Sequence, residues 1–308
     1  IHGAILSYLS LKKENFYMVE NTVDGKFFVT ARGWEDLSEI LKSYEELQVE
    51  IGEELIGEFL QKEEIARDFA GYYRLYEKYK SDYQIQEILD GNVISGQLKT
   101  CCDMGKKASF EERFTVTEML LEAVTERISV FQKTDEKIEK LYENLKLLKI
   151  FLQEKNSAEA MEQFVASRRK ALDAKICSEL LTAEEAAREE EQIRILEEYF
   201  FQLKELHISD VAEGIEQIGE RFGNVCRLRN EKLEETKKML EQAFSFLEEC
   251  FGEGQELLLF ETGLTGDDRC SIFISQYGCP SYFKHCELLL YSKKENEMRK
   301  ECRDLLEE

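Results

Sequence analysis

Residues 28–38 read Phe-Val-Thr-Ala-Arg-Gly-Trp-Glu-Asp-Leu-Ser, and they are the most informative stretch of the chain. The first two residues favour an extended approach. Thr30 suits an N-cap, because its hydroxyl can accept a hydrogen bond from a free amide of the first turn. Arg32 then falls in that turn, beside Trp34, the only tryptophan of the chain. An arginine at a helix start combines a guanidinium fork with free backbone amides, and both favour a bound phosphate. Arg32 is therefore a candidate nucleotide ligand.

Upstream of this stretch, the sequence predicts one helix and a small hairpin. Residues 5–9 place apolar side chains on one helical face. Residues 24–25 are Asp-Gly, a turn signal between apolar flanks, so residues 18–20 and 26–29 are expected to pair as strands.

Downstream, apolar residues at helical spacing predict two further helices before residue 90. The second of these is rich in tyrosine. Its aromatic residues step by three and four: Phe69, Tyr73, Tyr76 and Tyr83. Rows of this kind usually pack in or near a core, because each ring buries area while its hydroxyl stays wet.

A break is expected over residues 89–105, which contain three glycines, the adjacent Cys101 and Cys102, and no strong period. We place a domain boundary there, with a small domain over residues 1–92 and a helical-bundle domain over residues 93–308.

The second domain reads as long amphipathic helices. Spacings of three and four recur over residues 116–152, as in a coiled-coil seam. Capping boxes at Thr115–Glu118 and Thr182–Glu185 predict two helix starts. A turn near Asn156 separates two helices, and a further helix beginning at residue 209 or 210 should stop at residues 252–254.

The last part of the chain is less regular. Residues 257–260 are too short and apolar to assign to a strand or a buried helix, so a strand within residues 255–291 stays open. Residues 267–277 read as a helix closed by Gly278, and residues 292–308 as a terminal amphipathic helix.

Composition agrees with a helical chain. One proline in 308 residues, with abundant Glu, Lys and Leu, favours long helices with short connections. The expected fold class is all-α: a small helical domain with a minor hairpin, followed by a long antiparallel helical bundle.

Charge excludes some partners. The formal net charge of −23 repels nucleic-acid phosphates and anionic lipid, so neither is expected as a partner. No apolar run reaches the roughly 18 residues of a membrane span.

The nine cysteines show no metal-binding spacing, so no metal is expected, and we interpret them as unpaired, buried thiols of a reducing cytoplasm. The three histidines, His2, His207 and His285, have no recognisable nucleophile or metal constellation around them. A hydrolytic enzyme acting by itself is therefore the least favoured function.

A block of the first 92 residues resembles the lid of bacterial MoxR-like, dynein-related AAA+ ATPases. It comprises Asn15-Phe16-Tyr17, Glu20, Asp24-Gly25 and Thr30–Ser38. Residues 108–113 and 254–260 more loosely resemble a C-terminal helical extension found in bacterial members. The resemblance implies a cytoplasmic, ATP-driven ring that remodels or activates another protein, often a partner with a von Willebrand A domain.

The resemblance also implies that Arg32 is the sensor-2 arginine, which contacts the nucleotide from the lid. The rest of the ATP and Mg²⁺ machinery is missing, because no G-x-x-x-x-G-K-[ST] loop occurs in the sequence. The chain would then be the C-terminal part of an ATPase, cut just upstream of its lid, with no catalytic residue and no hydrolysis of its own.

Two alternatives stay open. Arg32 could simply pair with an acidic neighbour on the surface of its own domain. The whole chain could also be a helical scaffold or adaptor that binds partner proteins through coiled-coil-like surfaces and uses no nucleotide.

Overall fold

The computed structural model describes residues 1–22, 25–92, 95–155, 160–205 and 210–290. These residues are almost all helical, with a single two-stranded antiparallel sheet among them. The all-α fold class is therefore confirmed, minor hairpin included.

The chain forms two compact units, and α7 (Phe110–Lys155) and α10 (Val211–Phe251) contribute to both. Unit 1 comprises Ile1–Ile128 and Lys237–Glu308, and unit 2 comprises Ser129–Thr236. The expected division into domains over residues 1–92 and 93–308 stays a prediction.

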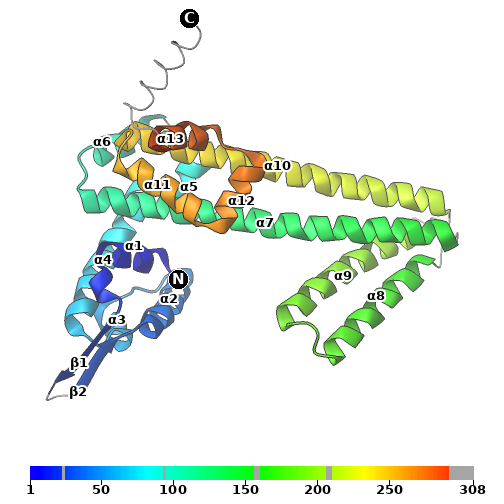
Figure 1. Cartoon of the computed structure of the whole chain (residues 1–308), viewed down its shortest axis with the longest axis horizontal. Helices are drawn as coiled ribbons and strands as arrows, with labels where there is room; N and C mark the ends of the chain where they lie inside the picture. Colours follow the sequence, from blue (N-terminus) through cyan, green and yellow to red (C-terminus); the bar gives the residue numbers. More distant parts are fainter. Residues whose placement is uncertain (23–24, 93–94, 156–159, 206–209, 291–308) are drawn as a thin grey trace, which may run out of the picture. The chain divides into compact units, whose positions relative to one another are not determined.

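The first part of unit 1 is a group of short helices from which the hairpin β1–β2 extends (Figure 1). Its elements are α1 (Gly3–Leu11), a 3-10 turn (Lys13–Asn15), β1 (Met18–Thr22), β2 (Gly25–Val29), α2 (Ala31–Glu46), α3 (Glu53–Phe59), α4 (Glu63–Tyr83) and α5 (Ile85–Asp90).

The local predictions for this part are confirmed where the structure describes the residues. The strands pair in antiparallel register, with Met18 opposite Val29. Asp24 of the predicted turn lies outside the described residues. Thr30 caps α2, since its Oγ1 accepts a hydrogen bond of 3.2 Å from the Gly33 amide.

The core of this part is aromatic. The Trp34 side chain is only 2% exposed, and its ring meets that of Phe69 edge-on at 5.2 Å. Tyr8 contacts the same Phe69 ring at the same centroid distance. Tyr73 and Tyr76 are also buried. The tyrosine row on α4 is therefore packing, as its spacing predicts.

The expected break over residues 89–105 is wrong in part, because α6 (Ser95–Gly105) is a helix. Cys101 and Cys102 lie on its buried side, and Cys102 forms a disulfide with Cys250 of α10. The expectation of unpaired thiols is thus wrong for this pair. It is confirmed for Cys101, Cys270 and Cys279, which are free and buried, whereas Cys177 is free but exposed.

The predicted helix start at Thr115 is also wrong, because α7 begins earlier in the chain. Ser109 Oγ accepts a hydrogen bond of 3.2 Å from the Glu112 amide, so a second Ser-x-x-Glu pattern starts the helix. Thr115 lies inside the helix, where its hydroxyl donates to the Glu111 carbonyl at 2.7 Å.

The rest of unit 1 packs the end of α10 with three short helices: α11 (Gln255–Gly266), α12 (Asp268–Tyr277) and α13 (Pro280–Leu290). Residues 257–260 belong to α11, and residues 255–290 contain no strand within the described part. The predicted stop at Gly252 and the cap at Gly278 are confirmed, and both glycines have a positive φ. Residues 292–308 lie outside the described residues.

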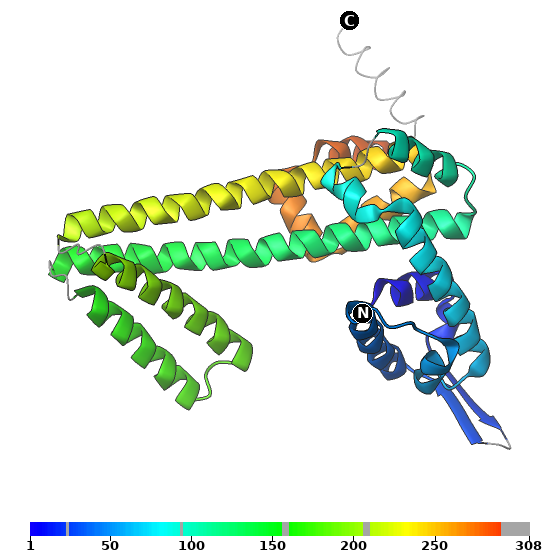
Figure 2. The same cartoon turned by 180° about the vertical axis from the view of Figure 1, so that it is seen from behind.

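In unit 2, α8 (Ala160–Cys177) and α9 (Ala183–Glu205) lie side by side, as both views show (Figure 1, Figure 2). They pack with parts of α7 and α10 around a leucine-rich core that includes Leu148 and Leu196. The Thr182–Glu185 box is confirmed: the Thr182 amide donates to Glu185 Oε2 at 2.8 Å. Asp210 caps α10 through the Glu213 amide at 3.1 Å. The predicted turn near Asn156 lies outside the described residues.

Among the residues that the structure describes, no helix combines the length and the apolarity needed to cross a bilayer.

Candidate functional site

Arg32, the one site residue that the sequence singles out, is the second residue of α2 and lies on open surface. Its side chain is 79% exposed, and its Nε lies 3.0 Å from Asp36 Oδ1. An exposed ion pair between residues four apart on a helix contributes only about 0.3–0.5 kcal/mol to stability. The pairing that the sequence left open as an alternative is thus present, yet it holds the guanidinium weakly.

The backbone under Arg32 is, in contrast, firmly placed. A Cβ added at Gly33 would lie 2.8 Å from the Phe59 carbonyl oxygen, so the first turn of α2 rests directly on the end of α3. The next residue, Trp34, is buried in the core against Phe69. The helix start is therefore fixed while the Arg32 side chain stays free to turn.

His2 belongs to a polar cluster that joins α1, α2 and α4. Its Nδ1 accepts from the Ala4 amide at 3.1 Å, so its Nε2 carries the proton and donates to Glu45 at 2.8 Å. Glu45 also accepts from Tyr73 and Lys80, both at 3.0 Å. Burial works to raise the Glu45 pKa, but the bonds from His2 and Lys80 prevail and lower it to about 2. The cluster ties the three helices together, and its His2 is only 7% exposed.

Glu122 of α7 continues this cluster. A Cβ at Gly3 would lie 1.6 Å from Glu122 Oε2, so the carboxylate fits against a glycine of α1. Burial raises the pKa of Glu122, although Tyr76 donates a hydrogen bond to it at 3.3 Å.

The other two histidines do not join His2. His285 is 2% exposed, pairs with Glu248 and stacks on Phe244 at 5.8 Å. His207 lies outside the described residues. Across the described ranges, no three His, Cys, Asp or Glu side chains come together as metal ligands would.

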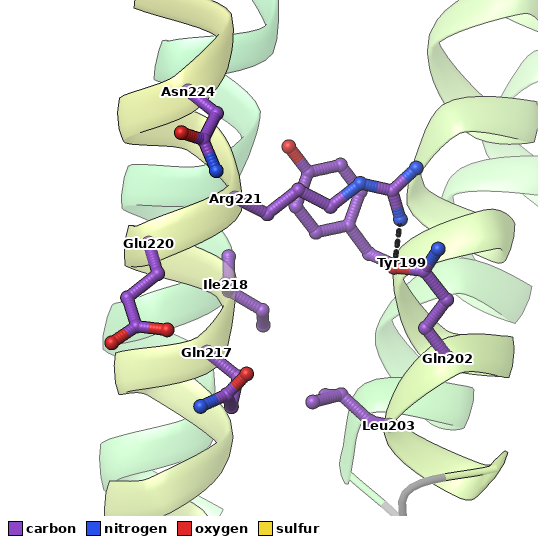
Figure 3. Close-up of a pocket in the computed structure, with 8 residues that line it drawn as sticks. All are labelled: Tyr199, Gln202, Leu203, Gln217, Ile218, Glu220, Arg221 and Asn224. Atoms are coloured by element: carbon purple, nitrogen blue, oxygen red, sulfur yellow. Dashed lines mark hydrogen bonds between the residues drawn. The ribbon is translucent and has the colours of Figure 1, made fainter.

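Unit 2 has a pocket between α9 and α10 that no sequence pattern indicates (Figure 3). Its volume is about 300 Å³. The residues that line it are Tyr199, Gln202, Leu203, Gln217, Ile218, Glu220, Arg221 and Asn224. Leu203 and Ile218 belong to the apolar packing of unit 2, and the periodicity of apolar residues does not indicate the polar groups beside them.

Tyr199 and Arg221 dominate the pocket. Tyr199 is 3% exposed, and its hydroxyl has no hydrogen-bond partner. The Arg221 guanidinium lies 4.2 Å from the centre of the Tyr199 ring and donates to Gln202 Oε1. The arrangement presents fixed donors in a hollow that opens to solvent.

No protein-family model, no curated protein and no solved structure matches this chain, so its assignment depends on the residues themselves.

Proposed function

We propose that this chain is the lid and helical extension of a MoxR-like AAA+ ATPase, and that Arg32 reports the phosphate state of a bound nucleotide. One observation carries the proposal: a weakly held, 79% exposed guanidinium stands on a helix start whose backbone is fixed. A sensor needs both properties. Its charged group must reach a ligand, and the backbone that carries it must transmit the resulting movement to the rest of the domain.

The start of α2 adds to the attraction for phosphate. Thr30 accepts from the Gly33 amide, and the earlier amides of the first turn have no partner within the helix. The helix dipole places partial positive charge at this end. An anion beside Arg32 would therefore meet both the guanidinium fork and this field.

The chain's own residues would bind and orient, and they would not carry out the chemistry. Phosphoryl transfer needs a phosphate cradle and a positioned Mg²⁺, and the sequence contains no G-x-x-x-x-G-K-[ST] loop. We therefore place ATP, Mg²⁺ and turnover in a longer polypeptide. Assembly into a ring, a von Willebrand A partner and a cytoplasmic location belong to the same proposal.

The test uses that longer polypeptide, with the residues encoded upstream of Ile1. Arg32→Ala should lower kcat/KM for ATP by about 10- to 100-fold, the usual effect of losing a hydrogen bond to a charged group. Arg67→Ala is the matched control, because Arg67 is 61% exposed and also pairs with an acid four residues away. The control should keep normal turnover. Equal kinetics for the two variants would remove Arg32 from the nucleotide site.

A second function, the nucleotide-free scaffold, is favoured by the apolar side chains that unit 2 exposes. They are Val130, Tyr142, Leu147, Ile150, Ile176, Leu180, Phe201 and Leu228. The buried core of a contact surface between proteins is more apolar than the rest of the protein surface. If the longer polypeptide binds no fluorescent ATP analogue, the scaffold is the better proposal.

A further inference from the structure

We propose that the pocket between α9 and α10 binds a single carboxylate carried on a short apolar body. The inference concerns unit 2 alone and does not depend on the proposed function. It rests on an unpartnered buried hydroxyl, a fixed guanidinium, two facing apolar side chains and two acids at the rim.

The Tyr199 hydroxyl is the first observation. Buried polar groups nearly always have a hydrogen-bond partner, so one without a partner calls for an explanation. Tyr199 is 3% exposed, its hydroxyl has none, and the residue lines the pocket. Burial raises its pKa, although Arg221 lowers it, so the phenol keeps its proton at neutral pH and acts as a donor.

The Arg221 guanidinium is the second donor. It is held over the Tyr199 ring at 4.2 Å, and one of its amino groups donates to Gln202. Another lies 3.6 Å from Glu198. Because a guanidinium has five N–H donors, some remain for a ligand. Fixing the group in advance lowers the cost of binding.

Figure 3 shows how the donors are placed. The Tyr199 ring lies between the two helices, with its hydroxyl directed toward α10, and the amide of Asn224 lies on the same side. Arg221 reaches across the ring toward α9. A ligand in this space would meet donors from both helices, so it must supply acceptors. A carboxylate has acceptors only.

The remaining residues define the body and the charge of the ligand. Leu203 and Ile218 extend toward each other from the two helices (Figure 3), which suits a short apolar chain. Glu198 and Glu220 stand beside the pocket and would repel a second negative charge. They favour a monocarboxylate over a phosphate or a dicarboxylate.

The volume of about 300 Å³ lies at the lower end of the range of small-molecule pockets, which is roughly 300–1,000 Å³. It suits a small branched acid or the C-terminal residue of a peptide. Both offer the same chemistry from different sources, so the experiment needs an arm for each.

The experiment titrates the full 308-residue chain, with binding followed by calorimetry and NMR. One arm compares 4-methylpentanoate with 4-methylpentanamide. The other compares acetyl-Ala-Gly-Gly-Leu bearing a free carboxylate with the same peptide amidated. We expect the acid to bind about tenfold more tightly than its amide in at least one arm. The arm that binds identifies the source. No saturable binding in either arm, or equal binding of acid and amide, overturns the proposal.

Variants locate the binding. Tyr199→Phe removes only the hydroxyl and should lower the affinity for the carboxylic acid about tenfold without lowering the melting temperature. Arg221→Gln should lower that affinity at least as much. Tyr142→Phe and Arg227→Gln are the controls, since both residues belong to unit 2, are exposed and line other surfaces. Unchanged affinity in Tyr199→Phe overturns the assignment.

Discussion

Unit 1 and unit 2 are both helical, but they bury different groups. Every buried His or Glu among the described residues lies in unit 1: His2, Glu256, Glu261 and His285. Unit 1 also contains the disulfide between Cys102 and Cys250. Unit 2 has a leucine-rich core with its charges outside. Unit 1 thus combines a largely apolar core with specific buried polar partners, whereas the core of unit 2 contains no buried charged side chain among the described residues.

The largest expected effect tests whether the leucine core supports unit 2. Leu196 is fully buried, so Leu196→Ala should cost about 2–5 kcal/mol of unfolding free energy through lost burial and a cavity. Leu228→Ala, at a position 59% exposed in the same unit, should cost little. Chemical denaturation followed by circular dichroism measures both. Equal effects would contradict the description of this core.

The disulfide provides the corresponding test of unit 1. It joins residues separated by 148 positions, so it restricts the unfolded chain strongly. Cys250→Ala should lower the stability of unit 1 by about 2–4 kcal/mol, and a reductant should do the same to the unchanged chain. Cys226→Ala removes a free thiol from the same helix and is the control. A reductant that leaves the denaturation midpoint in place would rule out this contribution.

The pH response should separate the two units further. The Glu45 pKa is lowered from 4.5 to about 2, against the effect of burial, by bonds from His2 and Lys80. A lowered acid pKa adds stability that is present above the unfolded value and is lost as the pH falls through the folded one. We expect Glu45 to contribute on the order of 2 kcal/mol, lost between about pH 4.5 and pH 2.

Glu45→Gln should remove that part of the acid dependence, as seen in denaturation curves recorded across the pH range. Glu39→Gln is the control, because Glu39 lies on the same helix with its side chain 75% exposed. An unchanged acid slope in Glu45→Gln would show that the cluster contributes nothing to stability.

The smallest effect compares helix caps across the units. Thr182→Ala in unit 2 and Ser109→Ala in unit 1 should each cost about 1 kcal/mol, since each removes an N-cap acceptor. Thermal unfolding measures the loss. A cost in only one variant would mean that tertiary contacts already hold the other helix start.

Local patterns predicted much of the fold. Thr30 and Thr182 cap helices as expected, because a cap depends on residues within one turn. Thr115 did not, because the competing pattern at Ser109 lies earlier in the chain and starts the helix first. The α6 helix was missed because residues 89–105 show no strong apolar period, and its disulfide joins it to Cys250, which is distant in sequence.

The sites show the same limit. Arg32 could be singled out because the motif that contains it is continuous in sequence. Its role as a nucleotide sensor stays a prediction. Tyr199 and Arg221 come from different helices, and no periodic pattern says that they meet. Only the packing of α9 against α10 brings them together.

Gly33 determines the direction in which the Arg32 side chain leaves the start of α2. Because the Phe59 carbonyl is backbone, it has little room to yield to a methyl group 2.8 Å away, so Gly33→Ala would tilt the helix start and swing the neighbouring charge with it. The direction of the Arg32 side chain thus depends on a residue that has no side chain. A substitution at Gly33 would change that direction without altering any charge.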